Sequence, residues 1–222
     1  MILEILFIIL QVKKRMGSSM QYIFYYINNN LYQKKGGIMC VILEKIQGKS
    51  PEELLQEYGI SPIPPINVSL LLQRIGIREV PMDFSEIEDI CKINRGDVLG
   101  IIYAKSDSLT ILYKATDTLN RKRFTLAHEI AHCCLNADTL KETHIELRSI
   151  QTATTPKEIN ANIFAGALLI PKSSIERVHS QFIGVPDIND LAKIFNVSTT
   201  VMAARLRYLN LPFMSDNEVT ED

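Results

Sequence analysis

The chain has 222 residues, 46% of them hydrophobic and 22% charged, which fits one globular domain that can bury a substantial core. A formal net charge of -1 argues against a general nucleic-acid binder, because such proteins carry a basic excess that neutralises phosphates. The cysteines, Cys40, Cys91, Cys133 and Cys134, form no C-x-x-C pair. This usage favours buried thiols in a reducing compartment, and we expect a cytoplasmic protein.

Residues 1–38 have the features of a leader that lies outside the fold. The opening run MILEILFIIL contains Glu4 and is shorter than the roughly 20 apolar residues that a membrane-spanning helix needs. It also lacks the preceding positive charges and the cleavage site of a signal peptide. Lys35-Gly36-Gly37 can be encoded by a purine run of the ribosome-binding type, so we expect Met39 to be the natural start. A membrane-surface anchor is the alternative.

The elements after Met39 begin with two short helices and a strand. Ser50 is placed to cap a helix that Gly59 ends, and Val68–Ile75 forms a second helix that stops at Gly76. Ile77–Phe84 is predicted to be a strand, and the proline within it indicates a position at the edge of a sheet.

A hairpin and two long helices follow. Val98–Ala104 and Leu109–Ala115 are β-rich runs around a short polar turn. We expect the second run to be an edge strand, whose free backbone groups could pair with an extended peptide. Helices are predicted at about Arg121–Leu135 and at Lys157–Ile170, and Pro171 ends the second.

The last predicted helices, Ile188–Phe195 and Thr199–Leu209, resemble a helix-turn-helix, with Ser198 as the cap of the second. Their basic residues are few (Lys193, Arg205 and Arg207), so we expect packing on the core, and DNA binding is the alternative.

The order of elements predicts an α+β fold with a small mixed or antiparallel sheet and a C-terminal helix-turn-helix-like part. We expect a main domain at 39–185, a helical subdomain packed on it at 186–212, and a tail at 213–222.

The chemistry lies in the segment His128-Glu129-Ile130-Ala131-His132. Residues four apart share one face of a helix, so His128 and His132 can present two imidazoles to one metal. Zinc accepts such nitrogens, keeps a position for water in catalytic sites and lowers the pKa of that water. Glu129 lies about 100° round the helix, beside the metal, and is the candidate general base.

A surface helix that happens to carry these residues is the alternative interpretation. The neighbours oppose it, because Leu126, Ile130, Cys133 and Leu135 make the helix apolar nearly all round. Two histidines and a glutamate in a buried helix need partners, and a metal supplies one.

Glu158 is a candidate third ligand, since it opens the next helix with Asn162 on the same face. Asn162 could then hydrogen-bond a ligand histidine from behind. The alternative for Glu158 is an acid that stabilises the dipole of its helix.

The chain resembles the ImmA/IrrE-type zinc metallopeptidases. The resemblance rests on the runs Arg121–His132, Glu158–Pro171 and Leu191–Leu209, which occur in family order. It implies a gluzincin-like catalytic domain that binds Zn2+, with an acid after the motif as third ligand. Members of the family often cut a helix-turn-helix repressor encoded beside them in a mobile element or stress operon.

In this chain the resemblance implies His128, His132 and Glu158 as ligands and Glu129 as base. Two departures stand out. Asn160 replaces a second glutamate that many members carry, and Asn136 replaces a histidine. We carry no role over to Asn136. A non-catalytic regulator that binds DNA or a repressor with the same fold is the alternative function, and the substrate and the oligomeric state stay open.

Other residues give weaker signals. Cys133 and Cys134 adjoin His132, but we interpret them as small core residues. His144 and His179 could stabilise an oxyanion, and a surface or capping role is the simpler interpretation. Tyr103 and Tyr113 are on the predicted hairpin, where cross-strand packing competes with a role in the site.

Overall fold

The computed structural model describes residues 41–91, 94–105, 108–137, 140, 144–149 and 155–215. The expected leader at 1–38, the expected start at Met39 and the end of the tail lie outside these residues. In the described part of the chain, no helix is both long and apolar enough to cross a membrane.

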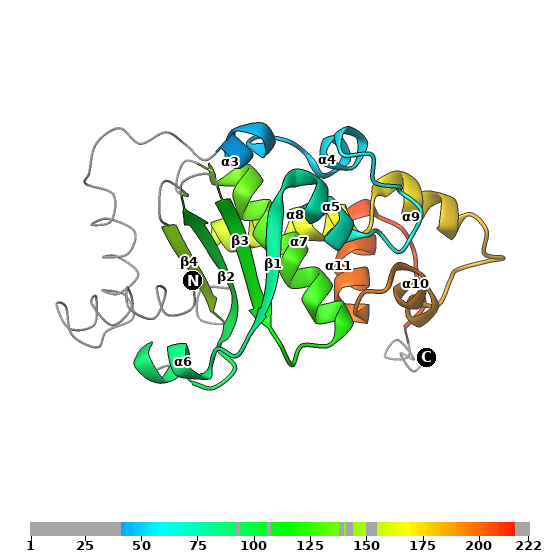
Figure 1. Cartoon of the computed structure of the whole chain (residues 1–222). Helices are drawn as coiled ribbons and strands as arrows, with labels where there is room; N and C mark the ends of the chain where they lie inside the picture. The colour runs from blue at the N-terminus through cyan, green and yellow to red at the C-terminus, as the bar shows by residue number, and fades with distance from the viewer. Residues whose placement is uncertain are drawn as a thin grey trace.

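A mixed sheet forms one side of the molecule (Figure 1). In the described residues it has four strands in the order β1-β3-β2-β4. The central hairpin of β2 and β3 is antiparallel, β1 joins β3 in parallel, and β4 joins β2 antiparallel. The bounds are Ile77–Met82 for β1, Val98–Lys105 for β2, Ser108–Lys114 for β3 and His144–Ser149 for β4. The predicted α+β fold with a small mixed sheet is confirmed.

The sheet corrects one prediction. β3, expected at the edge, lies between β1 and β2 and is paired on both sides. A substrate therefore cannot pair with it. The sequence showed a hairpin before the histidine helix but not that β1 would pair with its outer strand. The edge position predicted for Ile77–Phe84 is confirmed, although β1 ends at Met82.

In the part of the chain that the structure describes, three short helices precede β1. The first, α3 (Val41–Ile46), was not predicted. α4 (Pro51–Glu57) begins at the expected cap, where the Ser50 side chain accepts from the Glu53 amide and the Glu53 carboxylate accepts from the Ser50 amide. α5 (Val68–Ile75) ends as expected at Gly76, whose φ of 95° suits a residue without a side chain.

The unpredicted helix α6 (Ser85–Cys91) anchors the start of β2. Its buried Glu88 carboxylate accepts hydrogen bonds from the amides of Gly96 and Val98, at 2.8 and 3.2 Å. Buried carboxylates need such partners, so this contact fixes where β2 enters the sheet.

Two helices hold most of the candidate site. α7 (Leu119–Leu135) begins two residues before the expected start, because the Thr118 hydroxyl caps it by accepting from the Arg121 amide. α8 (Pro156–Leu169) is capped by Thr155. α7 packs against α8 and against β2 and β3, so it lies between the sheet and the remaining helices (Figure 1).

The C-terminal helices are α9 (Lys172–His179), α10 (Ile188–Phe195) and α11 (Thr199–Leu209). α10 and α11 have the predicted bounds, and Ser198 caps α11. α11 packs on α10 and on α8. Next to α10, Met214 pairs with Asp187 through its backbone.

The sheet buries side chains on both faces. Ile102 and Ile111 pair across the hairpin and belong to the main core with the helices. Ile101 and Leu112 also pair and are fully buried, but lie outside that cluster. Since side chains alternate along a strand, these two pairs occupy opposite faces.

Arg123 ties α7 to two other segments. Three nitrogens of its guanidinium donate to backbone carbonyl oxygens: Nη1 to Ile66 at 2.7 Å, Nε to Asn196 at 3.1 Å and Nη2 to Phe195 at 3.4 Å. Burial removes water from around this guanidinium and lowers its pKa. The side chain therefore fastens the end of α10 and the approach to α5 to the start of α7.

We expect Arg123→Met to lower the free energy of unfolding by about 2 kcal/mol, because it leaves carbonyl oxygens without their charged donor. Arg95→Met, at an ion pair with Asp89 in which both side chains are exposed, should change it by less than about 0.5 kcal/mol. Urea unfolding followed by circular dichroism measures both. Equal losses would show that Arg123 does not join these segments.

Candidate metal centre

Helix α7 buries both histidines of the motif. Every side chain from Thr125 to Cys134 is buried, and His128 and His132 are 0% and 1% exposed. Their spacing of four residues puts the rings on one face, with centroids 4.7 Å apart. The Nε2 atoms of the two rings are 2.9 Å apart. The helix thus holds two imidazole nitrogens side by side and away from solvent.

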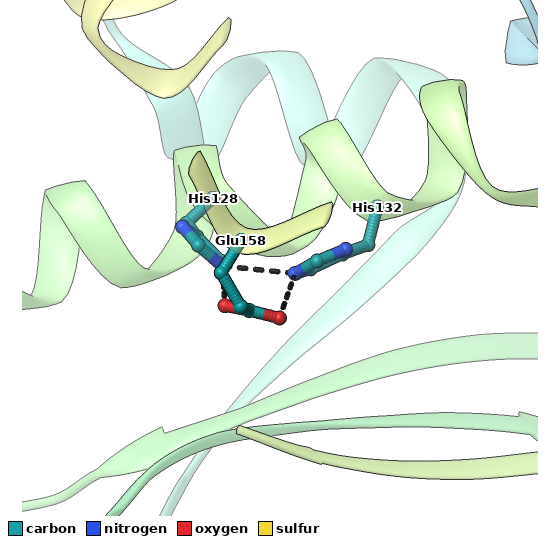
Figure 2. A group of neighbouring side chains, drawn as sticks. All are labelled: His128, His132 and Glu158. Carbon is teal, nitrogen blue, oxygen red and sulfur yellow. Dashed lines mark hydrogen bonds and ion pairs between the residues drawn. The ribbon is translucent and has the colours of Figure 1, made fainter. Parts of the chain in front are cut away.

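Glu158 approaches the same point from α8. The Thr155 cap sets the start of that helix and places Glu158 in its first turn. Its carboxylate Oε2 lies 3.0 Å from Nε2 of His128, and Oε1 lies 3.3 Å from Nε2 of His132. Figure 2 shows the two rings and the carboxylate pointing toward one another. The structure therefore brings together the three residues that the spacing singled out.

Two asparagines orient the rings from behind. Oδ1 of Asn162 lies 2.8 Å from Nδ1 of His128, the contact expected from the sequence. Oδ1 of Asn136 lies 3.3 Å from Nδ1 of His132, which was not expected. The i to i+4 spacing from His132 could have revealed this second contact. An amide oxygen accepts from Nδ1–H, so each ring turns the lone pair of Nε2 toward Glu158.

The donor set fits a metal ion. Two Nε2 lone pairs and an anionic carboxylate repel one another at these distances unless a cation lies among them. Four-coordinate zinc with bonds of about 2.0–2.1 Å holds its ligand atoms about 3.4 Å apart. The separations of 2.9, 3.0 and 3.3 Å come close to that value, so a small opening of the cluster admits the ion.

The comparison with known families agrees with this geometry. The family model described as peptidase M78, the IrrE N-terminal-like domain, matches residues 90–207, more than half of the chain. The chain belongs to the M78 family. No curated protein sequence matches it. As an M78 member it contains a metallopeptidase domain, and the predicted resemblance is confirmed.

The surroundings of Glu158, the third candidate ligand of this M78 site, keep its carboxyl group charged. Burial raises the pKa of the Glu158 carboxyl, but its contacts with the rings of His128 and His132 lower it by more. The net result is a pKa well below the ordinary value, so Glu158 is a carboxylate at neutral pH. Carboxylate oxygen is the form that binds zinc.

Glu129 lies between α7 and the sheet. Its side chain is 0% exposed, and its carboxylate lies against the backbone of Gly100 in β2. A buried acidic side chain next to a candidate metal ligand in the chain is typical of an active site. The sequence indicated the residue but not the strand that it touches.

Of the weaker candidates in the described residues, neither cysteine belongs to the group of candidate ligands. Cys133 and Cys134 are buried in the core, as expected, and burial raises the pKa of the Cys134 thiol to about 12. His179 donates to the carbonyl oxygen of Pro212, 2.7 Å away. Tyr113 packs under the ammonium group of Lys122. The side chain of His144 lies outside the described residues.

Surface shape alone does not locate the centre. Hollows of about 560 and 430 Å³ lie along α8 and α11 and share Ile163, Arg205 and Tyr208 in their walls. None of the three clustered residues lines either hollow, although Asn162 borders the smaller one. The site is identified by its donor atoms.

We expect Zn2+ to raise the melting temperature of chelator-treated protein, because an ion that binds only the folded state stabilises it by about 2.7 kcal/mol at a hundredfold excess over Kd. His128→Ala should abolish the rise, and His179→Ala, which removes a histidine outside the cluster, should keep it. Differential scanning calorimetry with and without zinc measures the shift. A rise of the same size in His128→Ala would place the metal elsewhere.

Proposed function

We propose that the protein is a zinc-dependent endopeptidase that cleaves a specific protein, a helix-turn-helix transcriptional repressor of a mobile element or stress operon. The observation that carries the proposal is the buried convergence of His128, His132 and Glu158, with the buried Glu129 next to His128 in the chain. A metal cluster next to a buried carboxylate in an M78 domain has the parts that peptide hydrolysis needs.

In this proposal His128, His132 and Glu158 hold the zinc. Two neutral imidazoles and one carboxylate form a catalytic ligand set that leaves a coordination position open. A zinc ion bound there would supply Lewis acidity toward the scissile carbonyl and toward a water molecule. Asn162 keeps the His128 ring in the tautomer that ligation requires, by accepting from its Nδ1.

Glu129 is the proposed general base. Its carboxylate takes a proton from the attacking water and passes it to the leaving amine, so the same residue serves as base and then as acid.

The helix-turn-helix-like part supports a role in packing and in gripping the substrate. Arg205, one of its few basic residues, is 7% exposed, and its Nε donates to the carbonyl oxygen of Ile170 at the end of α8. Lys193 pairs with Asp190, and Arg207 lies over the ring of Phe213. Little positive charge then remains for DNA phosphates.

The proposed organisation is a catalytic domain at 39–185 with a helical subdomain at 186–212 packed on it and a tail at 213–222. The packing of α11 on α8 supports such an arrangement, because α8 carries Glu158 and Asn162. A cytoplasmic location is part of the proposal, since buried thiols suit a reducing compartment.

Glu129→Gln tests the activity. The substitution keeps the size of the side chain but removes the base, so cleavage should fall by about 10²–10⁴-fold while zinc content stays at the wild-type level. The assay incubates both proteins with any small helix-turn-helix repressor that is found encoded beside the gene and follows the fragments by mass spectrometry. An intact repressor with zinc-loaded wild-type protein would favour a non-catalytic regulator.

Asn162→Ala tests the support of the metal. It should weaken zinc affinity by about 10–100-fold, because the ring of His128 loses its orienting partner. Asn160→Ala, on an exposed side of the same helix, is the matched control and should keep the affinity. Competition with a chromogenic chelator measures both constants. Equal affinities in the two variants would deny Asn162 this role.

A further inference from the structure

Gly100 stands in the interior of β2, in the run VLGIIYAK. A glycine weakens a strand, because it has no side chain to pack and loses more backbone freedom than other residues on folding. Gly100 has no left-handed φ, unlike Gly76 and Gly96. The backbone conformation therefore does not require glycine here, and the reason must lie in the space around it.

That space is filled by the carboxylate of Glu129. A Cβ atom at position 100 would lie 2.6 Å from Oε1 and 3.3 Å from Cδ of Glu129, and 3.0 Å from Cγ2 of Thr125. The first distance is too short for any real carbon–oxygen contact. Both neighbours are buried on α7, so neither can turn outward into solvent to make room.

The strand cannot retreat from the helix either. β2 is paired on both sides, and Gly100 lies opposite Tyr113 of β3 and Arg148 of β4. The register with β4 shifts between Val98 and Gly100, so an irregularity of the β-bulge type comes directly before the glycine. Bulges alter the local direction of a strand and occur beside active sites.

We propose that Gly100 is a positioning residue for the catalytic carboxylate. Its missing side chain lets Glu129 lie directly against the backbone of β2, and this contact sets the distance of the carboxylate from the His128, His132 and Glu158 cluster. The inference rests on the proposed function of Glu129 as general base.

The kinetic test is Gly100→Ala in the full chain, with Gly166→Ala as the matched control. A Cβ at Gly166 meets nothing within 4 Å beyond its own helix. Displacing a reacting group by about 1 Å can cost on the order of a hundredfold in rate, so kcat on the repressor should fall at least about tenfold in Gly100→Ala. KM and zinc affinity should stay close to wild type, and Gly166→Ala should keep kcat. An unchanged kcat in Gly100→Ala, or a loss that follows zinc affinity, would overturn the proposal.

A second test does not depend on cleavage. Gly100→Ala should lower the melting temperature of the wild-type chain, and Glu129→Ala should remove most of that loss by freeing the space, so the two effects are not additive. The same loss in both backgrounds would show that Thr125 or the strand requires the glycine, and would end the proposal. If the wild-type protein cleaves no repressor but the melting temperatures show this coupling, the proposed function fails while the packing of Glu129 against Gly100 stands.

Discussion

The structure depends on a buried cluster of polar atoms between α7 and α8. Two imidazoles and a carboxylate lie away from water, and buried polar groups are tolerated only when each finds a partner. Asn162 from α8 and Asn136 from the end of α7 accept from the Nδ1 atoms of the rings, and Glu158 from α8 faces the Nε2 atoms, where a cation would join the three groups. Any shift of α7 along α8 would break several of these contacts together, so the metal centre also fixes how the two helices pack.

The sheet supplies the other boundary of the site. α7 packs against β2 and β3, and the carboxylate of Glu129 occupies the space left by Gly100. β2 can hold this position because its start is anchored by Glu88 and both its edges are paired. The sheet therefore contacts the site through the backbone of one strand, which lies against the carboxylate of Glu129. Helix α8 contacts the site through side chains that lie against the two histidine rings.

Local signals predicted much of the fold. Capping residues act within one turn of backbone, so Ser50, Gly76 and Ser198 marked helix ends that the structure reproduces. α6 and β4 were missed, since the place of each depends on distant partners: Glu88 reaches across to the start of β2, and β4 needs the free edge of β2. The edge position expected for β3 was wrong for the same reason, because its outer neighbour β1 lies about 30 residues earlier in the chain.

The sequence by itself determined the chemistry of the centre. Helical periodicity puts His128 and His132 on one face of their helix, and Glu158 and Asn162 on one face of the next helix, independently of the tertiary structure. Only the tertiary structure decided that these two faces meet, that Asn136 holds the second ring, and that Glu129 lies against a glycine in β2. Spacing within a helix is set by local backbone geometry, whereas contacts between elements are set by packing, which no local pattern encodes.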